Sequence, residues 1–177
     1  EENNINGIYE KKQINEGEIE SIVNEVKNEK ISGVNVTTPY KKAVIPFIDQ
    51  LTPIAKEAQS VNTIFKKDNK IFGDNTDISG FEQSLKHINY SVKNKKILIL
   101  GAGGVTPSII LALKRLETSR ITLSNRTKEK AEILKKIYPY IETINWGKIT
   151  DFDMIINATS LGLKNEDEIK LNYTEIG

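Results

Sequence analysis

The chain has 177 residues with 25 basic and 24 acidic side chains, so its net charge of +1 gives no electrostatic reason for binding nucleic acid or an anionic membrane. It contains no cysteine and a single histidine, His87. This composition excludes disulfides and thiolate metal sites within the chain and leaves no set of imidazoles for a metal centre, so we expect no metal.

The apolar runs and the ends of the chain bear on localisation and completeness. No run reaches the length of a membrane span and no signal-peptide pattern opens the chain, so we expect a cytoplasmic protein without a membrane partner. The first residue is Glu1, the only methionine is Met154, and the chain stops at Gly177 soon after an apolar run. We therefore expect a fragment of a longer protein.

The N-terminal part of the chain alternates strand-like and helix-like patterns. A weak alternation predicts a short strand over Ile5–Ile14, and apolar residues at helical spacing predict an amphipathic helix within Glu16–Lys30. The β-rich run Ile31–Pro39 follows. A helix should then begin near Pro39 or Tyr40 and present apolar residues as far as Leu51 on one side, since proline is tolerated in a first helical turn.

A short helix at Ala55–Ala58 precedes two β-like runs whose spacing is typical of a hairpin. The runs are Val61–Phe65 and Lys70–Asp74, and the turn is Lys67–Asn69. A helix containing Phe81 and Leu85 follows, and His87 lies near its polar end, where we expect it to be exposed. The alternation indicates an α/β module.

Polar residues gather where the strand-like runs of this module end. They are Asn35 and Thr37 with Lys41, Asn62 with Thr63, and Asn75, Thr76 and Asp77. Ligands of α/β proteins collect beyond the carboxyl ends of strands, so these groups can converge on a polyhydroxylated molecule. Lys41 and Asp77 could also form the acid/base pair that interconversion of a hydroxyl and a ketone requires without a metal. The plainer alternatives are a helix cap for Asp77 and a solvated lysine for Lys41.

The polar segment Asn89–Lys95 is the candidate boundary between two modules, which we place at residues 1–92 and 93–177. Beyond the boundary the two patterns alternate regularly. Strands are expected at residues 96–100, 120–124, 141–145 and 153–157, and helices at residues 104–117 and 127–138. This order is that of the first half of a doubly wound nucleotide-binding fold.

The glycine-rich turn Gly101–Gly104 stands between the first of these strands and the first helix. Bare backbone N–H groups at a helix N-terminus suit a pyrophosphate, and glycines are needed because a Cβ would block its close approach. Gly101 and Gly103 match the first two glycines of the dinucleotide fingerprint, whereas Thr106 stands at the third. A purely structural turn is the alternative.

Arg126 follows the second of these strands, where an NAD-binding fold would place an acidic residue against the ribose. Lys128 and Lys130 lie nearby. A guanidinium attracts a 2′-phosphate that a carboxylate would repel, so the segment favours NADP over NAD. A solvated basic helix start is the alternative. A methyltransferase would also use a glycine-rich turn, but Arg126 would be a poor partner for a neutral ribose.

The chain resembles the shikimate dehydrogenase family, because several separated motifs occur in the same order as in that family. They are Gly33-Val-Asn-Val-Thr-Thr-Pro-Tyr-Lys41, Ser60-Val-Asn-Thr63, Gly73-Asp-Asn-Thr-Asp77 with Gly80-Phe81, Gly101-Ala-Gly-Gly104, Asn125-Arg-Thr127, and Asn157-Ala-Thr-Ser160 with Gly162. The resemblance implies an α/β substrate-binding and catalytic domain followed by a Rossmann-like NADP-binding domain, both incomplete at their outer ends. It also implies reversible NADP-dependent reduction of 3-dehydroshikimate to shikimate in aromatic amino-acid biosynthesis.

The resemblance carries roles onto particular residues. The catalytic pair falls on Lys41 and Asp77, and substrate contacts fall on these two with Thr37 and Asn62. Cofactor contacts fall on Gly101, Ala102, Gly103, Gly104, Val105, Asn125, Arg126, Thr127, Lys130 and Thr159. The expected partners are the small-molecule substrate pair, with a homodimer left open as an alternative to a monomer.

The chain departs from the family pattern at its ends and in one turn. The family's upstream Ser-x-Ser segment and its C-terminal segment with a substrate-binding Gln have no counterpart here, so the chain as written could be inactive. Thr106 and Pro107 replace the small and often basic residues usual after the glycines. A dehydrogenase of quinate or another hydroxylated ring acid, and a non-catalytic relative that binds NADP, are the alternatives.

Overall fold

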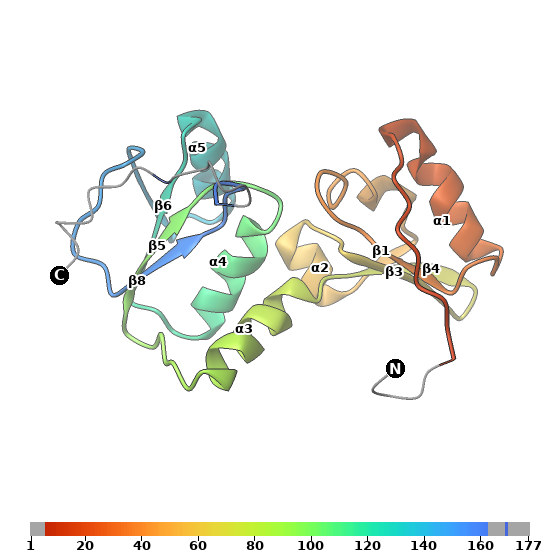
Figure 1. Ribbon diagram of the computed structural model, residues 1–177, viewed down its shortest axis with the longest axis horizontal. Coiled ribbons are helices and arrows are strands. Elements are labelled where there is room, and N and C mark those ends of the chain that lie inside the picture. Colours follow the sequence, from red (N-terminus) through yellow and green to blue (C-terminus); the bar gives the residue numbers. More distant parts are fainter. Residues whose placement is uncertain (1–5, 163–168, 170–177) are drawn as a thin grey trace.

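A computed structural model describes residues 6–162 and 169, which form two lobes of mixed α/β structure side by side (Figure 1). Each lobe contains one four-stranded sheet. The first lobe holds β1 to β4, and the second holds β5 to β8. Among the described residues, none of the helices combines the length and the hydrophobicity that crossing a membrane would require.

The sheet of the first lobe has the strand order β1-β3-β4-β2. Its strands are β1 (Gly33–Asn35), β2 (Gln50–Leu51), β3 (Thr63–Lys67) and β4 (Lys70–Asp74). β3 and β4 form the predicted antiparallel hairpin, and Asp68 and Asn69 in its turn have φ angles of 48° and 61°. Aspartate and asparagine tolerate this left-handed conformation, which matches the twist of the strands.

The predicted amphipathic helix is confirmed as α1 (Ile19–Lys27), preceded by the 3-10 turn η1 (Glu16–Glu18). Its apolar side is buried against β3 and β4. The core of the first lobe comprises Ile19, Val23, Val26, Val44, Ala55, Val61, Ile64 and Ile71. A helix of this kind closes one face of the small sheet and leaves its charged side in water.

Two predictions for the first lobe are wrong. The described residues of Ile5–Ile14 form no strand, and Ile8 and Tyr9 are 91% and 79% exposed, so the weak alternation faces no apolar partner. Turns and the short 3-10 helix η2 (Ile45–Phe47) replace the helix expected from Pro39. Pro46 would fall inside that helix, where it lacks an N–H donor and clashes with the preceding turn.

Two further helices of the first half of the chain pack against α4 of the second lobe. The predicted short helix is confirmed as α2 (Pro53–Ala58), which starts where the Thr52 hydroxyl accepts a hydrogen bond from the Ala55 N–H. The predicted helix after the hairpin is α3 (Asp77–His87). His87 at its end is exposed, as expected.

The sheet of the second lobe is entirely parallel, with the order β7-β6-β5-β8. Its strands are β5 (Lys96–Leu100), β6 (Arg120–Ser124), β7 (Glu142–Ile144) and β8 (Met154–Asn157), and its helices are α4 (Thr106–Arg115) and α5 (Lys128–Ile137). All six elements lie where the sequence predicts them. The arrangement is half of a doubly wound sheet.

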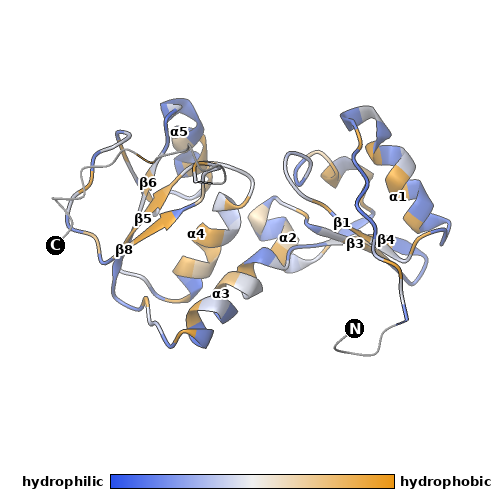
Figure 2. Cartoon of the chain, viewed as in Figure 1, coloured by the Kyte–Doolittle hydropathy of each residue, from blue (hydrophilic) through white to orange (hydrophobic). Residues whose placement is uncertain are grey.

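Both faces of β5 are covered, which explains its unbroken apolar sequence. Ile97 and Ile99 face the cluster that α4 and α5 contribute, and Leu98 and Leu100 pack in a second cluster with Phe152. Figure 2 shows β5, β8 and much of α4 in the colours of hydrophobic residues. A strand buried on both sides fixes the position of the turn that follows it.

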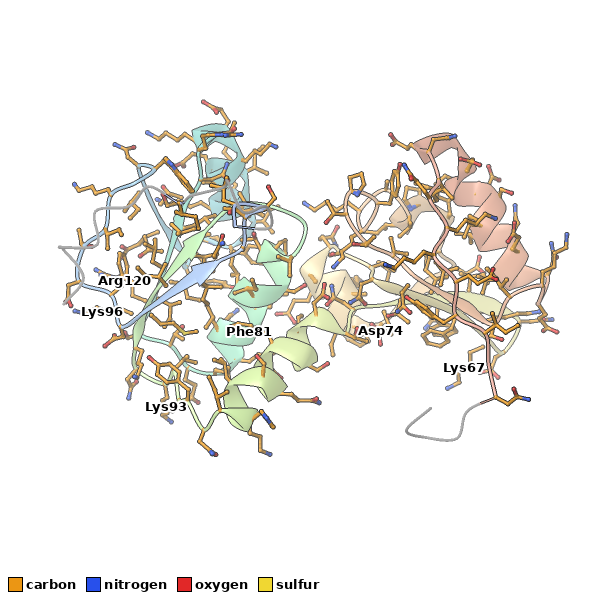
Figure 3. The ribbon with its side chains drawn as sticks, in the orientation of Figure 1. Lys67, Asp74, Phe81, Lys93, Lys96 and Arg120 are labelled. Atoms are coloured by element: carbon orange, nitrogen blue, oxygen red, sulfur yellow. The ribbon has the colours of Figure 1, made fainter. Side chains whose placement is uncertain are left out.

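The lobes meet where α2 and α3 pack against α4 (Figure 1). Ile78 and Leu85 of α3 belong to the core cluster of the second lobe, and Phe81, labelled on α3 in Figure 3, packs against that cluster. The Tyr138 hydroxyl donates a hydrogen bond of 3.5 Å to the Glu57 carbonyl. Burial, and then the nearby Glu57 carboxylate, raise the pKa of Tyr138 to about 12. The two lobes therefore share one apolar core at their junction.

We predict that Ile78→Ala destabilises both lobes together, because Ile78 is fully buried at their junction. The loss should be about 2–5 kcal/mol in the free energy of unfolding. Denaturant unfolding followed by circular dichroism, and by fluorescence of Trp146 in the second lobe, should give one coincident transition at a lowered midpoint. The control Ile88→Ala changes an isoleucine that is 65% exposed at the end of α3 and should cost less than about 0.5 kcal/mol. Two separate transitions would show that the cores are independent.

Candidate active site

Lys41 and Asp77 form an ion pair between two segments of the first lobe. The distance from Lys41 Nζ to Asp77 Oδ2 is 2.8 Å, and the side chains are 13% and 21% exposed. Lys41 lies in the turn after β1, and its carbonyl accepts a hydrogen bond from the Val61 N–H. Asp77 is the first residue of α3. The structure therefore brings together the two residues predicted as an acid/base pair.

Asn62 joins this pair through its side chain. Its Nδ2 donates hydrogen bonds of 2.8 Å to Asp77 Oδ1 and 3.0 Å to the Thr76 hydroxyl, and its Oδ1 accepts one of 3.0 Å from the Thr76 N–H. Asn62 is 8% exposed. Thr37 stands just before the turn that carries Lys41, and its side chain is exposed. Ammonium, carboxylate, amide and hydroxyl groups thus gather at one side of the first lobe.

The glycine-rich turn follows β5 and leads into α4. Gly101 has a φ of 104°, and a Cβ there would lie 2.8 Å from Thr159 Cγ2 and 2.9 Å from the Ala158 carbonyl oxygen. A Cβ on Gly103 or Gly104 would make an ordinary van der Waals contact, at 3.8 Å and 3.7 Å, and Gly103 is exposed. The neighbour of Gly104 is the Thr38 hydroxyl of the first lobe. The turn therefore faces the loop that carries Lys41.

Thr106 closes this turn where the fingerprint has its third glycine. Its hydroxyl donates a hydrogen bond of 2.8 Å to the Gly101 carbonyl, and the residue is fully buried. Val105 is the N-cap of α4, so the positive end of the helix dipole lies beside Gly103 and Gly104. The turn is thus closed by a side-chain hydrogen bond at the position where the dinucleotide fingerprint has its third glycine.

The segment after β6 holds the turn from its other side. Asn125 Oδ1 accepts a hydrogen bond of 3.0 Å from the Ala102 N–H, and its Nδ2 donates one of 2.7 Å to the Thr127 carbonyl. Arg126, Thr127 and Lys130 are exposed. Within residues 6–162 and 169, neither Arg126 nor Lys130 makes an ion pair, so both cations are available to an anion in solvent.

Thr159 follows β8 and packs against Gly101. Its hydroxyl donates a hydrogen bond of 2.7 Å to Asn157 Oδ1 and accepts one of 3.0 Å from the Leu161 N–H. This network orders the carboxyl end of β8 next to the glycine-rich turn. The segments expected to hold a cofactor thus lie beyond the carboxyl ends of β5, β6 and β8. Among the described residues, no cluster of acidic or histidine side chains could hold a metal ion.

The sequence did not point to Ser108, which lies in the first turn of α4 and is fully buried. It shares hydrogen bonds with Asn75, the residue between β4 and Thr76. The available signal was a hydroxyl directly before the apolar stretch of α4, and such a residue is also typical of an ordinary helix.

Comparisons with known proteins place both lobes in one family. The model described as the shikimate dehydrogenase substrate binding domain matches residues 1–64, and the model described as shikimate / quinate 5-dehydrogenase matches residues 83–163. The shikimate dehydrogenase (NADP(+)) of Pelagibacter ubique is 58% identical over 172 residues, which are 97% of this chain and 65% of that protein. That of Aquifex aeolicus is 40% identical, over 96% of this chain and 63% of that protein.

Solved structures agree in fold. The crystal structure of the Aquifex aeolicus shikimate dehydrogenase superposes with a TM-score of 0.81 at 40% identity, over 92% of this chain and 61% of that one. The Thermus thermophilus enzyme, crystallised with NADP(H) and shikimate, superposes with a TM-score of 0.74 at 30% identity, over 81% of this chain and 54% of that one. The chain spans 65% and 63% of the two curated relatives named above. With both of its lobes matched by the family's models, the chain belongs to the shikimate dehydrogenase family.

Proposed function

We propose that the protein catalyses the reversible NADP-dependent reduction of 3-dehydroshikimate to shikimate. The observation that carries this proposal is the ion pair between Lys41 and Asp77, whose carboxylate Asn62 also binds. The loop that holds Lys41 faces the glycine-rich turn of the other lobe. An acid/base pair opposite a dinucleotide cradle is the set of groups that interconversion of an alcohol and a ketone requires. The relatives with the name shikimate dehydrogenase (NADP(+)) support the same reaction.

The residues of the second lobe fit NADP. Gly103 and Gly104 present backbone without a Cβ at the N-terminus of α4, as the close approach of a pyrophosphate requires. Arg126 and Lys130 offer exposed cations for a 2′-phosphate, with Asn125 and Thr127 in the same segment. When bound, NADPH supplies the hydride for reduction of the ketone. We propose that Gly101 to Val105, Asn125 to Thr127, Lys130 and Thr159 form this site.

Lys41 and Asp77 would handle the proton. In the direction of ketone reduction, the Lys41 ammonium donates a proton to the substrate oxygen as negative charge develops there. In the direction of alcohol oxidation, the Lys41 amine accepts the proton. Asp77 holds the Lys41 side chain through the 2.8 Å ion pair, and Asn62 holds the other oxygen of the same carboxylate. The dyad is thereby oriented before substrate arrives.

The hydroxyl groups of the substrate would be bound by polar side chains of the first lobe. We assign these contacts to Thr37, Lys41, Asn62 and Asp77. We further propose residues 1–92 as the substrate-binding and catalytic domain and residues 93–177 as the NADP-binding domain. Cytoplasmic localisation, which we expect from the sequence patterns, and a homodimer, which the sequence leaves open, also belong to this proposal.

Quinate is the second candidate substrate, because the family model that matches residues 83–163 is described as covering shikimate and quinate dehydrogenases. The enzyme at its natural length, incubated with NADP and either ring acid, should form NADPH with a higher kcat/KM for shikimate. A higher kcat/KM for quinate would assign the second substrate. No NADPH from either acid would refute the proposed function.

We predict that Arg126→Ala weakens NADP binding by roughly tenfold to a hundredfold and leaves NAD binding nearly unchanged. A charge-assisted contact of about 1.5–3 kcal/mol is lost only with the cofactor that carries a 2′-phosphate. Fluorescence titration with both reduced cofactors measures the two dissociation constants. Lys136→Ala, which removes an exposed cation from the last turn of α5, is the matched control and should affect both cofactors equally. Equal losses in Arg126→Ala would contradict the assignment.

We also predict that Lys41→Ala lowers kcat by roughly a hundredfold or more while changing substrate affinity less, the scale of lost acid/base catalysis. Asp77→Asn should lower kcat too, and the double variant should lose less than the product of the single effects, because the pair acts as a unit. Steady-state kinetics measures each value. Lys42→Ala removes the exposed neighbouring lysine of the same turn and serves as the control. If Lys41→Ala raises KM and spares kcat, Lys41 only binds substrate.

A further inference from the structure

A fully buried polar contact joins the two lobes behind the candidate active site. Asn75, between β4 and α3, is 2% exposed, and Ser108, in the first turn of α4, is fully buried. Asn75 lies two residues before the catalytic candidate Asp77. Ser108 lies on the helix whose N-terminus faces the candidate pyrophosphate site. The contact therefore links the two elements that have to be aligned for a transfer between substrate and cofactor.

The side-chain amide of Asn75 uses all of its hydrogen-bonding capacity. Its Nδ2 donates to the Ser60 carbonyl at 3.0 Å and to Ser108 Oγ at 3.1 Å. Its Oδ1 accepts from the Asp77 N–H at 3.0 Å and from the Ser108 hydroxyl at 3.3 Å. Since a hydroxyl can donate and accept at once, the Asn75–Ser108 pair is reciprocal. This arrangement permits one orientation of the amide only.

The same amide binds the backbone of Asp77 itself and the backbone of Ser60, which lies near Asn62 in the sequence. It fixes the start of α3 through the Asp77 N–H, which has no acceptor in the preceding turn of the helix. It also holds the Ser60 carbonyl, two residues before Asn62, whose side chain binds Asp77 Oδ1. Asn75 thus acts on the position of Asp77 from two directions without touching the ion pair itself.

Packing alone does not explain this network. The neighbouring positions on the two helices, Ile78 and Ile109, are buried isoleucines, so apolar side chains suffice to hold α3 against α4. A buried amide is costly unless every group is paired, and a fully paired one specifies a single relative position more strictly than apolar contacts do. A reciprocal hydrogen-bonded pair has preferred distances and angles, so it resists sliding more strongly than apolar surfaces do.

We propose that Asn75 and Ser108 are positioning residues that set the catalytic carboxylate of Asp77 in register with the glycine-rich turn. This inference rests on the proposed dehydrogenase function and assigns the network a role in the transfer step. Loss of the contact would leave both binding sites intact and displace one relative to the other. Small displacements of reacting groups lower the rate of the chemical step much more than they lower binding.

Ser108→Ala, measured in the enzyme at its natural length, tests the proposal. It should lower kcat roughly tenfold or more, with little change in the KM values for shikimate and NADP. The primary deuterium isotope effect on kcat should rise, because the transfer step becomes more strongly rate-limiting. Asn75→Ala should act in the same direction. The double variant should lose no more than the larger single effect, since both residues belong to one network.

Thr122→Val is the matched control, because Thr122 is 1% exposed in β6 and, within the described part of the chain, its hydroxyl has no hydrogen-bond partner. It removes an equally buried hydroxyl from the second lobe and should leave kcat and the isotope effect unchanged. Ser108→Ala could instead lower the melting temperature and show the same kcat and the same isotope effect as Thr122→Val. In that case the network has a structural role only, and the proposal is overturned. Multiplicative losses in the double variant would overturn it as well.

A second measurement does not depend on activity. Hydrogen exchange at the Asp77 amide should be roughly threefold to tenfold faster in Ser108→Ala than in Thr122→Val, since Asn75 then loses the partner that orients its Oδ1. Unchanged exchange would contradict the proposal even if the enzyme acted on another substrate. An inactive wild-type protein would refute the dehydrogenase function, and the exchange result would still decide whether Ser108 positions Asp77.

Discussion

The ion pair between Lys41 and Asp77 is the interaction on which the organisation of the first lobe depends. Lys41 precedes the β3–β4 hairpin in the sequence and Asp77 follows it, so the hairpin brings the two residues together. Both side chains are largely shielded from water, and removing either one would leave the other as a poorly compensated charge. Asn62 shares the carboxylate and further limits its freedom. The site is therefore oriented by hydrogen bonds within the protein.

The second constraint is the junction between the lobes. α2 and α3 belong to the first lobe by sequence, yet Ala58, Ile78 and Leu85 enter the core of the second lobe beside α4. This sharing explains how a small sheet with a short α1 can hold a fixed position opposite the glycine-rich turn. Outside the core, Arg115 pairs with Glu57 at 3.1 Å, an exposed contact that contributes little stability. Apolar packing supplies the stability, and the buried polar groups supply the alignment.

Charge is arranged locally in this nearly neutral chain. The exposed cations Arg126 and Lys130 lie in the segment that follows β6 in the second lobe. The Lys41 ammonium of the first lobe is instead balanced by the Asp77 carboxylate. This separation suits a large anionic cofactor on one side and a polyhydroxylated acid on the other. The overall charge of +1 conceals this distribution, since attraction to a bound anion depends on the nearest unpaired groups.

The amino-acid sequence by itself determined the second sheet, because unbroken apolar runs such as Ile97–Leu100 are buried on both faces and leave few alternatives. It also indicated the Lys41–Asp77 pair, since polar residues at strand ends converge by topology. Two predictions from the sequence were wrong. The weak alternation of Ile5–Ile14 predicted a strand that has no packing partner, and the apolar spacing after Pro39 predicted a helix that Pro46 prevents. Only the tertiary structure showed that Thr106 closes the glycine-rich turn and that Asn75 meets Ser108. Such contacts join residues far apart in the chain, and no local pattern specifies which buried hydroxyl finds which amide.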